Sequence, residues 1–209
     1  MIVQWCCKGV GEIGAKQVRS ILTDGVGLTC RLWQTSRHGM LHYPEAVKRL
    51  SEHHLDLHVN HYDETDPQTG KKVSDTTPFI SLSAGCVDRD VATRTNVIKP
   101  ARRTALAFAT GLGQSEGWLF SCYVIVAVNR AAAIPAVAEE VRDLNQLRRY
   151  SDYWTEGEVA AKINVPSRQI FSAEHWSPTG EGSVVVRDGY YINEGFVEPR
   201  ALVNLRELL

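Results

Sequence analysis

Two carboxylates lie one residue apart in the stretch Trp154-Thr155-Glu156-Gly157-Glu158-Val159. Side chains alternate along a strand, so Glu156 and Glu158 are expected to point to opposite faces if the second begins a strand. One carboxylate can then face a buried pocket while the other lies at its rim. Pro166 closes the segment, which favours a loop-to-strand junction, where catalytic groups are often placed. From this stretch alone, two solvated charges at a sheet edge are the alternative.

Two earlier segments carry chemistry that fits a nucleotide. Pro78-Phe79-Ile80-Ser81-Leu82-Ser83 predicts a strand that places both serines on one face, where two hydroxyls can fix a ribose and orient a carboxylate. Residues 27–33 predict another strand, because β-branched and aromatic residues follow a glycine turn. Arg31 then has an apolar setting and needs a bidentate anionic partner. That partner is a dinucleotide phosphate or, in the alternative, the carboxylate of a structural ion pair.

The order of these features resembles the mono-ADP-ribosyltransferases of the cholera-toxin-like group, which have an Arg on an early strand, a Ser-x-Ser strand and a Glu-x-Glu. Residues 156–161 and 165–170 are similar to the family's Glu-x-Glu-Val stretch and the segment after it. The resemblance spans roughly residues 28–176. It departs from the family's Tyr-Arg-x-Asp-Ser-Arg pattern, because a longer spacer separates Arg31 from Arg37.

The resemblance implies an α+β fold of the ADP-ribosyltransferase type, with two packed, mainly antiparallel β-sheets and flanking helices. It also implies an enzyme that uses NAD as a co-substrate, releases nicotinamide and transfers ADP-ribose to an acceptor. Glu158 would bind the ribose hydroxyl and stabilise the developing cation, whereas Glu156 would orient the acceptor and help to deprotonate it. A Glu at the first position implies that the acceptor is an arginine side chain of a protein.

The resemblance assigns NAD binding to Arg31, Ser81 and Ser83, with Ser81 as the leading serine. Tyr153 and Trp154 precede the carboxylates, where exposed aromatic side chains could pack against an acceptor protein, or else belong to the core. The identity of the acceptor does not follow from the sequence, and a nucleic-acid acceptor stays open.

Length and charge indicate one catalytic domain over residues 1–209, with residues 1–26 as a helical appendage in the alternative. The formal net charge of −1 gives no general argument for a nucleic-acid or membrane partner. The sequence has no apolar run long enough for a membrane span and no signal-peptide pattern at Met1. We therefore expect cytoplasmic synthesis, with action there or in a target cell as a toxin or effector.

Other patterns leave competing functions open. Residues 9–14 match Gly-x-Gly-x-x-Gly, typical of an NAD(P)-dependent oxidoreductase, although the expected acidic residue and the alternation of strands and helices do not follow. Hydrolysis of NAD at the transferase site and a non-catalytic binding module are further alternatives. The histidines between His53 and His61 lack a matching set of zinc ligands, so no metal is expected.

Three long segments complete the expected fold. Residues 101–110 predict a helix ended by Gly111, and residues 118–128 predict a buried central strand. Residues 136–149 predict an amphipathic helix, because Val137, Val141 and Leu144 have helical spacing.

Overall fold

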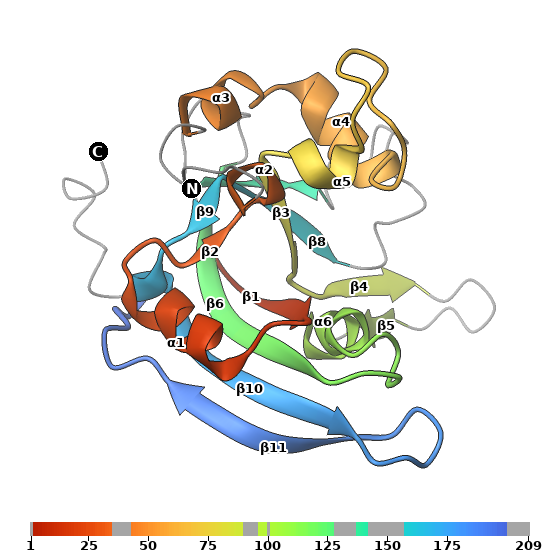
Figure 1. Cartoon of the computed structure of the whole chain (residues 1–209), viewed down its shortest axis with the longest axis vertical. Helices are drawn as coiled ribbons and strands as arrows, with labels where there is room; N and C mark the ends of the chain where they lie inside the picture. Colours follow the sequence, from red (N-terminus) through yellow and green to blue (C-terminus); the bar gives the residue numbers. More distant parts are fainter. Residues whose placement is uncertain are drawn as a thin grey trace.

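The computed structural model describes residues 2–34, 43–89, 96–99, 101–127, 137–141 and 157–199 (Figure 1). Its strands are β1 (Ile2–Gly11), β2 (Leu28–Thr29), β3 (Phe79–Ser83), β4 (Cys86–Arg89), β5 (Asn96–Lys99), β6 (Gly117–Ala127), β7 (Val137–Glu140), β8 (Glu158–Lys162), β9 (Asn164–Val165), β10 (Ile170–Pro178) and β11 (Val185–Ile192). Its helices are α1 (Ala15–Thr23), α2 (Arg31–Gln34), α3 (Tyr43–Lys48), α4 (Glu52–Asn60), α5 (Val73–Thr76) and α6 (Ala101–Ala109), with a 3₁₀ turn at Ser167–Gln169.

Seven strands form one sheet in the order β1-β3-β8-β7-β6-β10-β11, and β1 also pairs with β6. The pairings among β1, β3, β8, β7 and β6 therefore close on themselves, with β10 and β11 extending from β6. All the pairings in this sheet are antiparallel except that between β6 and β7. The predicted mixture of helices and mainly antiparallel strands is confirmed. Among the described strands, two smaller two-stranded sheets, β2-β9 and β4-β5, accompany the seven-stranded sheet.

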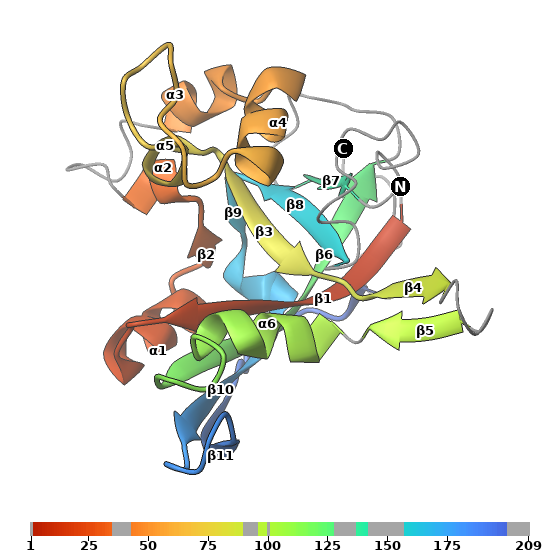
Figure 2. The same ribbon diagram turned by 90° about the vertical axis from the view of Figure 1, so that its right-hand side faces the viewer.

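The longest ladder joins β1 to β6, from Ile2 opposite Val126 to Gly11 opposite Gly117. Helix α6 lies directly across this ladder (Figure 2). A Cβ atom at Gly9 or Gly117 would overlap the carbonyl oxygen of Ala105 or Ala109 in α6. Glycine is therefore required where the helix backbone contacts the sheet.

This packing overturns the dinucleotide-loop interpretation of residues 9–14. Gly9 and Gly11 lie inside β1 and pair with Leu119 and Gly117, whereas a phosphate loop would connect a parallel strand to a helix. The glycines serve contact between helix and sheet, so the oxidoreductase alternative fails. The helical-appendage alternative for residues 1–26 is also wrong, because β1 pairs with both β3 and β6 within the main sheet.

Most of the other expected elements are present. The strand at residues 78–83, the helix at 101–110 and the strand at 118–128 correspond to β3, α6 and β6 within one residue at each end. The strand expected at residues 27–33 is wrong beyond Thr29, because α2 begins at Arg31. The helix expected from residue 136 is wrong where it can be compared, since residues 137–140 form β7.

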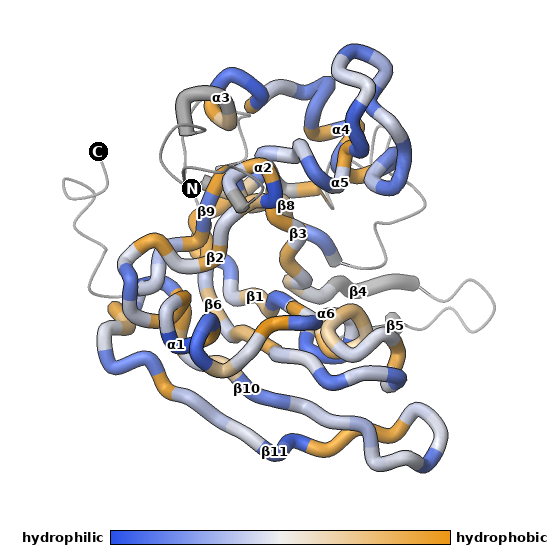
Figure 3. The backbone as a smooth tube through the Cα atoms, in the orientation of Figure 1, coloured by the Kyte–Doolittle hydropathy of each residue, from blue (hydrophilic) through white to orange (hydrophobic). Residues whose placement is uncertain are grey.

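The hydrophobic core joins buried residues of the main sheet to buried residues of α1, α2, α3 and α4. Figure 3 shows apolar residues concentrated along the interior strands, whereas the loops around α4 and α5 are hydrophilic. Helices α3, α4 and α5 gather at one end of the molecule, over β3 and β8 (Figures 1 and 2). None of the described helices is long and apolar enough to cross a membrane. The result is a rigid sheet with a helical cover over its β3 and β8 strands.

Candidate active site

Glu158 begins β8 and lies opposite Ser83 of β3. Only 8% of Glu158 is exposed, because β8 is hydrogen-bonded to β3 on one side and β7 on the other. Gly157, just before it, has φ 65° and its carbonyl accepts a 2.7 Å hydrogen bond from Ala84 N–H. A Cβ atom at Gly157 would collide with the backbone of Gly85. Glycine between the two glutamates is therefore required by the sharp entry into β8.

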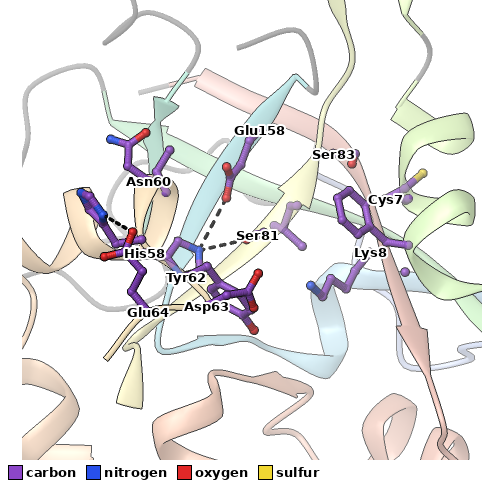
Figure 4. A pocket seen from close by; sticks show the side chains of 16 residues that line it. Cys7, Lys8, His58, Asn60, Tyr62, Asp63, Glu64, Ser81, Ser83 and Glu158 are labelled. Carbon is purple, nitrogen blue, oxygen red and sulfur yellow. Dashed lines mark hydrogen bonds and ion pairs between the residues drawn. The ribbon is translucent and has the colours of Figure 1, made fainter. Parts of the chain in front are cut away.

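His58 of α4 is the nearest described partner of Glu158. Its Nε2 lies 3.5 Å from Glu158 Oε1 and 3.0 Å from Ser81 Oγ (Figure 4). Its Nδ1 lies 2.8 Å from Thr77 Oγ1. Helix α4 begins after Ser51, whose hydroxyl accepts a hydrogen bond from His54 N–H and caps the helix. The helix thus delivers a buried imidazole onto the face of β3 that carries Ser81.

One oxygen of the buried Glu158 carboxylate lacks a hydrogen bond from the described residues. Its Oε1 atom is buried and has no hydrogen-bond partner among the described residues, because the contact with His58 is too long to be one. Burial opposes ionisation, but His58, Ser81 and then Lys8 outweigh it, so the pKa of Glu158 lies below its ordinary value. The site therefore presents an ionised carboxylate with an open acceptor atom to the cavity.

Lys8 supplies a cation from β1, and its side chain is half-buried. Within the described part of the chain no hydrogen bond or ion pair holds its ammonium group, whereas the nearby Glu158 charge acts on it at longer range. Burial lowers the pKa of Lys8, and the Glu158 charge opposes that effect. A desolvated ammonium without an adjacent carboxylate is suited to bind an anionic group of a ligand.

Two adjoining cavities meet at this cluster. One, of about 580 Å³, is lined by Glu158, Ser83 and Cys7. The other, of about 930 Å³, extends between α1 and α2 and is lined by Arg31 and Trp33. The residues common to both are Lys8, Gly9, His58, Tyr62 and Ser81. Each volume is in the range of ligand-binding pockets, and together they form one elongated cleft.

The cleft contains four of the residues singled out from the sequence. Ser81, Ser83 and Glu158 line the first cavity, and both serines face it as the alternation along β3 predicts. Arg31 lies farther along, exposed at the start of α2, and lines only the second cavity. The remaining three residues, Glu156, Tyr153 and Trp154, lie outside the described residues.

Sequence reasoning missed two members of the site. Lys8 lies just before residues 9–14, the segment interpreted as a dinucleotide loop, and was not singled out, whereas His58 was considered only as one of several clustered histidines. Both ring nitrogens of His58 contact hydroxyls of Thr77 and Ser81. The described residues contain no group of three or more side chains placed to bind a metal ion. Alternation along residues 2–8 could have placed Lys8 on the face opposite Cys7, but no sequence signal pairs His58 with Ser81.

No protein-family model and no curated protein sequence matches the chain. Among solved structures, it is similar to EcPltA, with a TM-score of 0.50 and 10% sequence identity over 94% of this chain and 89% of that chain. The chain is also similar to a heat-labile enterotoxin mutant described for the flexibility of an active-site loop in its A subunit. The TM-score is 0.47, with 15% identity over 95% of this chain and 79% of that chain.

A double mutant of heat-labile enterotoxin has a TM-score of 0.42 and 15% identity, covering 96% of this chain and 66% of that chain. The chain therefore shares its mixed α and β fold with EcPltA.

Proposed function

We propose that the protein is an NAD-dependent mono-ADP-ribosyltransferase that releases nicotinamide and transfers ADP-ribose to an arginine side chain of an acceptor protein. The observation that carries the proposal is the buried Glu158 carboxylate, whose Oε1 has no hydrogen-bond partner among the described residues although it faces a cavity. A buried carboxylate with a purely structural role would be paired with a cation or would accept hydrogen bonds from neighbouring donors. An open acceptor favours a role toward a ligand.

The chemistry of the transfer suits this carboxylate. Loss of nicotinamide leaves positive charge on the ribose, and an anion fixed nearby in a site of low dielectric stabilises that charge strongly. Glu158 is already ionised and anchored on a rigid strand, so little reorganisation is needed when the charge develops. Ser81, within hydrogen-bond distance of His58, is placed to help fix the ribose hydroxyls.

The elongated cleft suits a substrate with two phosphates. Lys8, at the junction of the two cavities, would bind the pyrophosphate, and Arg31 would add a second cation along the cavity between α1 and α2. Sequence reasoning assigned the phosphate contact to Arg31 alone. The geometry favours Lys8 for this contact, because Lys8 shares a cavity with Glu158 whereas Arg31 does not.

The acceptor would approach the Glu158 end of the cleft. Glu156 would orient the guanidinium and help to remove its proton, and Tyr153 and Trp154 would contact the acceptor protein. An enzyme of this type would act in the cytoplasm of its producer or as a toxin or effector delivered to a target cell. An NAD glycohydrolase at the same site differs only in using water as the acceptor.

The test measures nicotinamide release and label transfer from NAD, with and without an arginine-containing acceptor, in the wild type, Glu156→Gln and Glu158→Gln. The transferase predicts acceptor-dependent labelling, and Glu156→Gln should reduce labelling much more than release into water. Glu158→Gln should abolish both. Release without labelling would favour the glycohydrolase. Absence of both activities in the folded wild type would contradict the proposal.

A further inference from the structure

Thr77 contacts His58 on the Nδ1 side of the ring and lines the second cavity. It is 4% exposed and is the residue before Pro78, at the entry to β3. Its Oγ1 lies 2.8 Å from His58 Nδ1 and accepts a 3.2 Å hydrogen bond from Phe79 N–H. These are the hydrogen bonds that the described structure assigns to this hydroxyl. His58 itself is 3% exposed, so solvent offers little compensation for a polar atom left without a partner.

A neutral imidazole has two tautomers, and the contacts around His58 distinguish them. A hydroxyl has one hydrogen, and Thr77 already accepts from Phe79 N–H. If Thr77 donates this hydrogen to Nδ1, the His58 proton lies on Nε2 and points toward Ser81 Oγ and Glu158 Oε1. Every donor in the chain from Phe79 to Ser81 then has an acceptor.

The opposite tautomer leaves the same groups mismatched. With the proton on Nδ1, the Thr77 hydroxyl would accept twice and its own buried hydrogen would have no acceptor. The unprotonated Nε2 could accept the Ser81 hydrogen at 3.0 Å, but it would also face the carboxylate oxygen of Glu158 at 3.5 Å, which brings two lone-pair atoms together. Buried polar groups seldom remain in such an arrangement, because each unsatisfied group carries a desolvation penalty.

We propose that Thr77 is a positioning residue that fixes His58 as the Nε2–H tautomer. In this form His58 donates to Ser81 and leaves the Ser81 hydrogen free for Glu158 or a ribose oxygen. Among the described residues, the titratable groups that face the ring include Glu158 on β8 and Tyr62, whose ring lies 5.7 Å from it, and Lys8 of β1 lines the same two cavities. The catalytic consequence rests on the proposed function, but the tautomer does not.

The experiment records ring ¹⁵N shifts of His58 in the folded protein at assay pH, assigned by the loss of its signals in His58→Gln. The expected wild-type spectrum has a protonated Nε2 and an unprotonated Nδ1. An Nδ1–H or imidazolium spectrum would overturn the proposal without any measurement of activity. If the folded protein cleaves no NAD, the proposed function fails and the spectrum still decides the role of Thr77.

Three variants connect the tautomer to turnover. Thr77→Val keeps the shape, removes the hydroxyl, and should shift His58 toward the other tautomer with a roughly 10- to 100-fold lower kcat for nicotinamide release. Thr77→Ser should restore both the spectrum and kcat. Thr76→Val is the matched control, because the neighbouring hydroxyl bonds the Lys72 carbonyl instead. An unchanged tautomer and kcat in Thr77→Val, or equal losses in Thr77→Val and Thr76→Val, would contradict the assignment.

Discussion

The two ends of β8 each carry a buried charged side chain, but only one of the two charges is neutralised by an ion pair. Glu158 and Lys162 lie on the same face of this strand, four residues apart, and both are buried. Lys162 forms an ion pair with Glu139 of β7, with 2.5 Å between Lys162 Nζ and Glu139 Oε1. Glu158 faces a cavity, with His58 at 3.5 Å and one oxygen left open. The strand thus combines a completed structural ion pair with a charge held ready for a ligand.

The comparison predicts opposite costs for the two positions. A buried ion pair contributes through mutual compensation, so removal of one partner leaves an isolated charge. An open site charge already lacks full compensation in the folded protein, and its neutralisation should cost folding little. The cost should appear in activity instead.

Lys162→Met is expected to have the largest effect on stability. It leaves Glu139 buried without its cation, which should lower the free energy of unfolding by about 3 to 5 kcal/mol. The double variant Lys162→Met/Glu139→Leu should recover most of that loss. Denaturant unfolding of the single and double variants measures both values. No recovery in the double variant would mean that Lys162 stabilises β8 through other contacts.

Gly157→Ala should have the second-largest effect on stability, at the end of β8 that carries Glu158. The positive φ and the collision with Gly85 should together lower unfolding stability by about 2 kcal/mol or more and displace Glu158. Gly180→Ala is the matched control, since Gly180 has φ 84° with no heavy atom near an added Cβ. It should cost only about 1 kcal/mol. Equal thermal shifts in the two variants would contradict the close contact with Gly85.

Lys8→Met removes a half-buried cation that has no ion pair among the described residues, in contrast to Lys162, which is paired with Glu139. The variant should bind ADP-ribose about 10- to 100-fold more weakly, because a charge-assisted phosphate contact of roughly 1.5 to 3 kcal/mol is lost. Folding stability should not fall, since burial already disfavours the charged form of Lys8 and lowers its pKa. Calorimetry and thermal melts give both quantities. A larger loss of affinity in Arg31→Ala would return the main phosphate contact to Arg31.

A change of pH should have the smallest effect, which is measured on nicotinamide release. The pKa of Glu158 lies below 4.5, because His58, Ser81 and Lys8 together outweigh the burial that would raise it. A depressed carboxyl pKa contributes stability above the unfolded-state value, and this contribution is lost as pH falls through the folded-state value. Nicotinamide release into water should therefore decline only below about pH 4.5. A half-maximal rate on the acid side well above that pH would contradict an ionised, stabilised Glu158.

Local pattern predicted the parts of the site that depend on one segment. Alternation along residues 79–83 is enough to place Ser81 and Ser83 together, and the glycine before Glu158 marks the start of β8. The strand expected at residues 27–33 was extended past Thr29, although the chain turns into α2 after Cys30, so Arg31 lies on a helix and not on a strand. Propensity over a few residues does not determine where a short edge strand ends.

Tertiary contacts decided the remaining features. The spacing of Val137 and Val141 fits a helix, but pairing with β6 and the ion pair between Glu139 and Lys162 select a strand. The approach of His58 to Ser81 depends on how α4 packs over β3, and 23 positions separate the two residues in the chain. Pairings of this kind follow from the assembled sheet and not from the periodicity of either segment.

Nicotinamide release from NAD by Glu158→Gln tests the central claim most directly. The amide keeps the shape and removes the charge, so the rate should fall about 100-fold or more, a loss of roughly 3 kcal/mol of transition-state stabilisation, while the thermal melt changes little. Glu116→Gln, at an exposed site outside the cleft, should keep the wild-type rate. A folded Glu158→Gln variant that releases nicotinamide as fast as the wild type would contradict the account.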